Sequence, residues 1–152
     1  MPEKSLRELS TEKLQLLFDV NTIVPTLCAK HFLPKLNRKE RSIFAALSAR
    51  IGSISDNRLG GWYSYRLSKA ALNMAVKTLA IEWQRTHCNV SVIALHPSTT
   101  DTALSEPFQQ NVPKGKLFST AQTAGFLLEV LRSVSEKQSG EFLAFDGTSI
   151  DW

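Results

Sequence analysis

The sequence predicts an α/β fold in which a three-stranded parallel sheet is connected by crossover helices. Apolar segments with helical periodicity alternate along the chain with short apolar runs that fit buried strands. This alternation is typical of parallel sheets. The length of 152 residues, 43% of them hydrophobic, favours one domain spanning residues 1–152.

The first predicted helix covers residues 11–33. Its apolar residues recur at helical spacing, and Ser10 or Thr11 is available to cap its start. Because proline lacks an N–H group and clashes with the preceding turn, Pro25 should kink or restart this helix. The basic run at residues 35–41 is interpreted as a solvated loop, so we expect no nucleic-acid partner.

The first predicted strand is the apolar run at residues 42–48, which fits a strand buried on both faces. Gly52, Gly60 and Gly61 then indicate a loop. Residues 63–85 contain no glycine or proline and are rich in good helix formers, so they form the second predicted helix.

The rest of the chain supplies two strands and one helix. The β-branched run at residues 90–95, stopped by Pro97, is the second predicted strand. Residues 120–133 are rich in apolar side chains and predict a third helix that is buried over a wide arc. Residues 140–147, bounded by two glycines, predict the third strand.

Two further classes of protein are disfavoured. The sequence has no apolar run approaching the length of about eighteen residues that a membrane span needs, and its start lacks the layout of a secretory signal. We therefore expect a cytoplasmic protein with no membrane partner. Cys28 and Cys88 show no metal-ligand spacing, so we expect reduced thiols and no metal site.

Ligands of parallel sheets bind at the carboxyl ends of the strands, here residues 49–65, 96–102 and 146–149. Tyr65 and Lys69 lie four residues apart at the start of the second helix, so both should project from one face. The ammonium would favour the phenolate and lower the pKa of Tyr65 from its usual value of about 10. An exposed Tyr/Lys pair of this kind usually has no function, and the spacing alone leaves that alternative open.

An ordered set of motifs resembles the short-chain dehydrogenase/reductase family. The set comprises Asn21 within DVNT, the strand and loop at residues 48–52, Tyr65 to Lys69 followed by AALN, and the His96-Pro97 turn. The GGWYSYR stretch and the closing FDGT look most like the C-factor and related carbonyl reductases. The resemblance covers nearly the whole chain and implies the C-terminal half of a Rossmann-type doubly wound parallel sheet.

The resemblance also implies hydride transfer between NADP or NAD and a small carbonyl or alcohol substrate. Tyr65 would be the acid/base, and Lys69 would lower its pKa and bind the nicotinamide ribose. Asn21 would hold a water of the proton relay; the alternative is that it bonds its own bent backbone ahead of the proline. Pro97 and Thr102 would bind the nicotinamide end of the cofactor.

Two substitutions depart from the family pattern. The family's serine, three residues before Gly52, is replaced by Ala49. Ser53 is interpreted as the substrate-orienting hydroxyl instead, since Ser48 should point to the opposite side of its strand. Ser98 stands where the family has a glycine, so the backbone there should approach a cofactor less closely.

The largest departure is that no GxxxGxG turn precedes Asn21, so the cofactor-binding cradle is largely missing. The chain is therefore expected to be an N-terminally truncated member of the family. Its first strand should be an unpaired edge, and the isolated chain should be marginally stable or form a homo-oligomer through helices 11–33 and 63–85.

Three functions remain open: an impaired NAD(P)-dependent oxidoreductase, a non-enzymatic association module, and an inactive truncated fragment. His96 is interpreted as a packing residue at the end of a strand. Candidates to line a hydrophobic substrate pocket, for each of which core packing is the alternative, are Trp62, Tyr63, Leu104, Phe108 and Val112.

Overall fold

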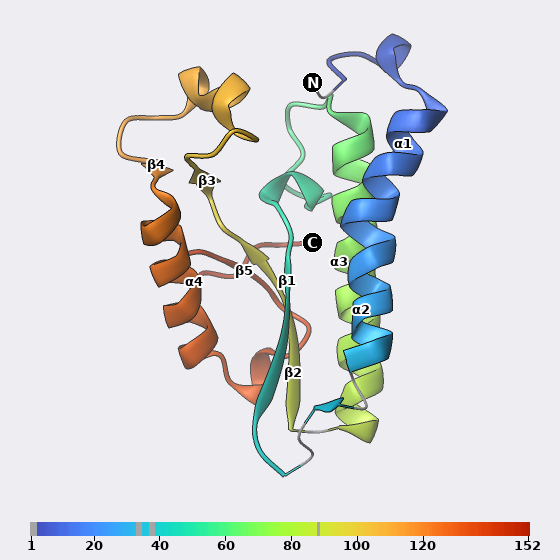
Figure 1. The fold of residues 1–152 in the computed structure, drawn as a ribbon, viewed down its shortest axis with the longest axis vertical. Helices are drawn as coiled ribbons and strands as arrows, with labels where there is room; N and C mark the ends of the chain where they lie inside the picture. The colour runs from blue at the N-terminus through green and yellow to red at the C-terminus, as the bar shows by residue number, and fades with distance from the viewer. Residues whose placement is uncertain (1–2, 33–34, 37–38, 88) are drawn as a thin grey trace.

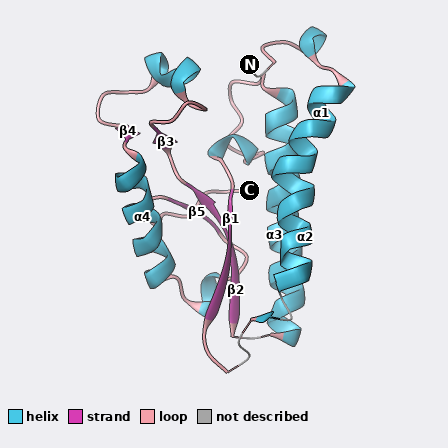
Figure 2. Cartoon of the chain, viewed as in Figure 1, coloured by secondary structure: helices cyan, strands magenta, loops and turns pink. Residues whose placement is uncertain are grey.

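The computed structural model describes residues 3–32, 35–36, 39–87 and 89–152 and has the predicted α/β architecture (Figure 1). Helices α1 (Thr11–Phe18), α2 (Val24–Phe32) and α3 (Tyr63–Thr86) run side by side along one face of the sheet. Helix α4 (Thr120–Ser133) lies on the other face, which Figure 2 also shows. The sheet is therefore covered by helices on both sides.

The main sheet consists of three parallel strands in the order β1-β2-β5. They are β1 (Ser42–Leu47), β2 (Val90–His96) and β5 (Phe142–Ala144). Because the pairing is parallel, with Leu47 opposite Leu95 and Leu95 opposite Leu143, the carboxyl ends of all three strands meet at one edge. The first predicted strand is at the edge of the sheet, as expected from the sequence.

Alternation along β2 divides the core into two clusters. Val90, Val92 and Ala94 pack with α3 side chains, among them Trp83, whose ring meets Phe44 edge-on at 5.7 Å. Ile93 and Leu95 point the other way and pack against Val130 of α4 and Leu143 of β5. Successive strand residues face opposite sides of a sheet, so α3 and α4 are held by different residues of one strand.

Two predictions of burial are wrong. Strand β1 is not buried on both faces: only Ala46 is buried, and Leu47 is 58% exposed. An edge strand lacks the neighbour that encloses the central strand β2 on both sides. Helix α4 is not buried over a wide arc, because among its apolar residues only Val130 is buried and Leu128 is exposed. A helix on the outside of a layered fold buries one stripe.

The first predicted helix is interrupted one turn before the expected kink. Residues Asp19–Ile23 form a π-helical turn, in which the N–H of Val24 donates to the carbonyl of Asp19, five residues back. Pro25 has no N–H to donate to the carbonyl of Asn21, so the regular α-helical hydrogen bonding is interrupted here. The wider π-helical turn lies directly before the proline. Helix α2 ends at Phe32, and the predicted last residue, Leu33, lies outside the described residues.

Smaller elements complete the fold. The loop after β2 contains β3 (Thr99–Thr100), which pairs in parallel with β4 (Leu117–Phe118) in a small sheet that the sequence did not predict. Cys28 is a free, half-buried thiol, and Cys88 lies outside the described residues. Among the helices described, none is both long enough and apolar enough to span a membrane.

Candidate active site

The first two turns of α3 carry the phenol and the ammonium singled out from the sequence. Lys69 Nζ lies 5.8 Å from the centroid of the Tyr65 ring. The same Nζ donates a hydrogen bond of 2.8 Å to the carbonyl of Leu47, the last residue of β1, and Lys69 is only 8% exposed. Lys69 is therefore held between the phenol and the carboxyl end of the edge strand.

The electrostatic prediction for this pair is wrong in direction. Burial raises the pKa of Tyr65 above its ordinary value of 10. Burial also lowers the pKa of Lys69 to about 8, because desolvation disfavours the charged form of each group. Burial therefore sets the direction of the shift at Tyr65, which keeps its proton at neutral pH.

Asn21 is brought to this pair by the π-helical turn. Its Nδ2 donates to Ser68 Oγ at 3.1 Å, and Ser68 Oγ donates to the carbonyl of Tyr65 at 3.0 Å. The hydroxyl of Thr22 donates to the carbonyl of Ser68 at 2.8 Å. The side chain of Asn21 thus reaches the helix that carries Tyr65 and Lys69, and within the described part of the chain no hydrogen bond joins it to its own backbone.

The loop after β1 is packed tightly against α3. Ser48 Oγ donates to Asn73 Oδ1 at 2.6 Å, and Asn73 Nδ2 donates to the carbonyl of Gly52 at 3.2 Å. A Cβ atom added to Gly52 would lie 2.7 Å from Lys69 Cβ and 2.9 Å from the carbonyl carbon of Lys69. Only a glycine fits here without moving the lysine.

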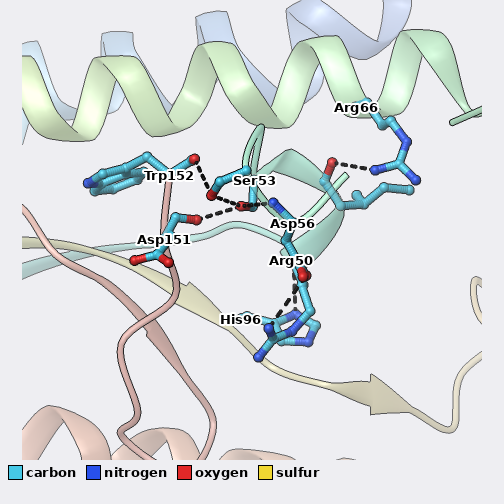
Figure 3. A network of polar contacts seen from close by, with 9 residues as sticks. Arg50, Ser53, Asp56, Arg66, His96, Asp151 and Trp152 are labelled. Carbon is cyan, nitrogen blue, oxygen red and sulfur yellow. Dashed lines mark hydrogen bonds and ion pairs between the residues drawn. The ribbon is translucent and has the colours of Figure 1, made fainter. Parts of the chain in front are cut away.

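Ser53 lies at the centre of a polar network in that loop (Figure 3). Its hydroxyl donates to the carbonyl of Asp151 at 2.5 Å and accepts the N–H of Asp56 at 3.1 Å. Among the described residues, no hydrogen bond joins Ser53 to Tyr65 or Lys69. The structure therefore shows Ser53 fastening the loop to the end of the chain, and its role toward a substrate stays a prediction.

His96, at the end of β2, lies beside the same loop (Figure 3). The N–H of Arg50 points to His96 Nδ1 at 3.3 Å. Burial, followed by the charge of Arg50, lowers the pKa of His96 to about 4, although Asp146 and Asp56 act in the opposite sense. His96 is therefore neutral at physiological pH.

The turn after β2 holds the two residues assigned to the nicotinamide. Pro97 is half-buried, and Thr102 is exposed, with its N–H donating to Ser105 Oγ at 3.2 Å. Ser98 has a φ of +63°, so the turn keeps the left-handed conformation that favours glycine although the glycine is absent. No hydrogen bond within the described residues joins Pro97 or Thr102 to Tyr65 or Lys69.

Two of the five candidate pocket residues are in contact. The rings of Trp62 and Phe108 lie 4.8 Å apart, which brings the start of α3 against the short helical segment Glu106–Asn111. Tyr63 and Val112 are half-buried, whereas Leu104 is 82% exposed. Trp62 and Phe108 thus form a small aromatic surface at the start of α3, three residues before Tyr65 in the case of Trp62.

Sequence reasoning missed Glu3, a buried carboxylate at the start of α3. It is 1% exposed, and it accepts the hydroxyl of Ser64 at 2.5 Å and the N–H of Ser64 at 3.3 Å. Burial alone would raise the pKa of Glu3, but the hydrogen bonds, those of Ser64 foremost, and Lys13 outweigh it and hold the pKa below 4.5. The sequence does contain one indication of such a residue: α3 begins after Trp62, whose side chain cannot cap a helix, so a cap from elsewhere in the chain is needed.

Comparison with known proteins identifies the family to which the chain belongs. A model of the family described as enoyl-(acyl carrier protein) reductase matches residues 1–147. The chain belongs to the short-chain dehydrogenase/reductase family. C-signal of Myxococcus xanthus is 31% identical to this chain over 135 residues, which are 89% of the chain and 76% of the relative.

The chain spans only part of other relatives in this family. The 1-hydroxy-2-glutathionyl-2-methyl-3-butene dehydrogenase of a Rhodococcus species is 33% identical over 134 residues, which are 88% of this chain and 56% of that enzyme. The carbonyl reductase Sniffer of D. melanogaster matches with a TM-score of 0.85 and 26% identity, and the NADPH-bound carbonyl reductase from chicken fatty liver with 0.84 and 29%. The chain is covered completely in both comparisons but spans only 62% of each of these structures.

The residues described fit one end of a nicotinamide cofactor. Lys69 uses one of its three N–H donors on Leu47, which leaves two for ribose hydroxyls beside the Tyr65 phenol. A pyrophosphate would need a free helix N-terminus. The helices that begin after a loop in the described chain are already capped: α1 by Ser10, α3 by Glu3 and α4 by Ser119. Among the described residues, these three helix N-termini are therefore already occupied by side-chain caps.

Proposed function

We propose that the chain carries the acid/base half of an NAD(P)H-dependent carbonyl reductase. The observation that carries this proposal is the half-buried phenol of Tyr65 with the ammonium of Lys69 beside it on one helix face. Tyr65 carries its proton at neutral pH, because burial raises its pKa further above 10, and this is the state needed to protonate a carbonyl oxygen.

The proton transfer involves Tyr65 directly. A bound nicotinamide would supply a hydride to the carbonyl carbon of the substrate. The Tyr65 O–H bond breaks as its proton passes to the carbonyl oxygen, so that an alcohol and a phenolate are formed. Lys69 would stabilise that phenolate by its charge and bind the ribose with its free N–H donors.

The other candidate residues support this step from neighbouring elements. Asn21 is bonded to Ser68, between Tyr65 and Lys69, where it would hold a water of the proton relay. Pro97 and Thr102 would bind the carboxamide end of the nicotinamide. Ser53 would orient the substrate only if its hydroxyl gave up the carbonyl of Asp151.

The substrate class we propose is a small aromatic or apolar carbonyl compound. The Trp62 and Phe108 rings offer an apolar surface next to the start of α3. Benzil reductase of Bacillus subtilis is a relative that is 26% identical over 155 residues, so benzil is a suitable probe. We also propose that this reaction takes place in the cytoplasm.

Equilibrium titration of the purified chain with NADPH and with NADH tests the proposal. Binding at the nicotinamide end alone should give a Kd of about 1 mM, which corresponds to about 4 kcal/mol. Quenching of tryptophan fluorescence and calorimetry measure it. Lys69→Met should abolish this binding because the ribose donors are lost.

Lys77 provides the matched control for that titration. It lies two turns further along α3, and its Nζ donates to the carbonyl of Gly140 at 3.2 Å, away from Tyr65. Lys77→Met should bind NADPH as the unmodified chain does. No binding of either cofactor at millimolar concentration, or equal loss in the two lysine variants, would reject the proposal.

We also propose that the chain self-associates through the faces of α1, α2 and α3 that point away from the sheet. Leu67, Met74 and Ile81, spaced seven residues apart on α3, are all exposed, and so are Leu16, Val20, Ile23, Val24, Leu27 and Phe32. Apolar residues grouped in this way favour association. Sedimentation should show a dimer that Met74→Glu dissociates and Leu128→Glu, on α4, does not. A monomeric unmodified chain would contradict this.

A further inference from the structure

The start of α3 follows an unusual backbone path. Gly60, Gly61 and Trp62 have φ values of +63°, +64° and +55°, so three consecutive residues adopt the left-handed conformation. Trp62 occupies the capping position and makes no side-chain hydrogen bond to the helix. A first turn entered in this way has unpaired N–H groups and no local cap to hold it.

Glu3 supplies the missing partner from 61 residues earlier in the chain. Its carboxylate accepts both the N–H and the hydroxyl of Ser64, and its backbone carbonyl accepts the N–H of Trp62 at 2.6 Å. Glu3 and Ser64 are both almost completely buried. A buried carboxylate at a helix N-terminus is stabilised by the helix dipole as well as by these bonds.

The next residue after Ser64 is Tyr65. We propose that Glu3 is a positioning residue that fixes the phenol of Tyr65 by capping the first turn of α3. The proposal deepens the reductase function and rests on it, because that function gives Tyr65 its importance. Glu3 itself touches neither the phenol nor Lys69 by any hydrogen bond among the described residues, so it acts through Ser64.

Two measurements on the full 152-residue chain test this without any cofactor. The chain has two tyrosines, so in a Tyr63→Phe background the absorbance of tyrosinate reports Tyr65 alone. Glu3→Ala should open the first turn, hydrate the phenol and move its titration midpoint down toward about 10. Amide exchange at residues 64–66 should become roughly five- to ten-fold faster, with residues 76–80 unchanged.

The controls separate positioning from general stability. Glu8 is an exposed carboxylate of the same segment that accepts the N–H of Lys4 at 3.0 Å, and Glu8→Ala should change neither measurement. Glu3→Gln keeps one acceptor oxygen toward Ser64 and should lie between Glu3→Ala and the unmodified chain. If Glu3→Ala does not fold, Glu3→Gln decides by its exchange rates.

Exchange that rises uniformly along α3, or a Tyr65 titration that does not move in a folded Glu3 variant, would overturn the proposal. Failure of the chain to bind NADPH would reject the reductase function and leave these two readouts untouched. The two proposals can therefore fail separately.

Discussion

Replacing Tyr65 with phenylalanine should lower the rate of NADPH-dependent benzil reduction by about 10²- to 10⁴-fold. The change removes the phenol that lies beside Lys69, and it leaves the aromatic ring in place. The decrease should fall on the rate and not on the affinity for NADPH. Initial rates of NADPH oxidation at millimolar cofactor, together with the equilibrium titration, measure the two quantities.

Tyr63→Phe is the matched control, since Tyr63 is the other tyrosine of the chain and lies two residues earlier on a different side of α3. It should retain most of the activity.

The rate of the unmodified chain should also fall as the pH rises through about 8, where Lys69 loses its proton. In Lys69→Arg, whose guanidinium stays charged, this decrease should be absent. Equal losses in Tyr65→Phe and Tyr63→Phe would contradict the assignment.

Replacing Gly52 with alanine should destabilise the chain by about 3 kcal/mol. The added Cβ would lie 2.9 Å from the backbone of Lys69, which cannot rotate away as a side chain can. Either the loop after β1 or the helix must move, and both movements pull Lys69 Nζ from the carbonyl of Leu47. Urea denaturation measures the loss of stability, and NADPH binding should weaken in the same variant.

Gly125 offers the opposite expectation for the same substitution. It lies within α4, and nothing lies within 4 Å of an added Cβ. Gly125→Ala should therefore raise the free energy of unfolding by about 1 kcal/mol, because alanine is the better helix former. If both glycine variants lose stability equally, the close approach at Gly52 is not the cause.

The elements with the strongest local signals could be predicted from sequence. Helix α4 has the predicted bounds, α3 ends within one residue of them, and β2 extends only to His96 beyond its apolar run. In these segments, the local side-chain pattern and the tertiary packing favour the same secondary structure. The π-helical turn could not be predicted in the same way, because it also depends on the bonds of Asn21 and Thr22 to Ser68, a residue on another helix.

The candidate site shows the same division between local and distant causes. The spacing of Tyr65 and Lys69 is local, and it places them together as predicted. The direction of the Tyr65 pKa shift does not follow from that spacing, since it is set by burial in the folded chain. Glu3 was overlooked for the same reason: its partner Ser64 is 61 residues away.

The π-helical turn also constrains the length of the chain in this region. An extra residue in a helix rotates everything beyond it by about 100° relative to everything before it. The apolar stripes of α1 and α2 are therefore out of phase with a single regular helix. Removing one residue between Asp19 and Ile23 would bring the stripes back into phase while turning Asn21 away from Ser68. For relatives of this chain, residue count in this segment should therefore vary less than residue identity.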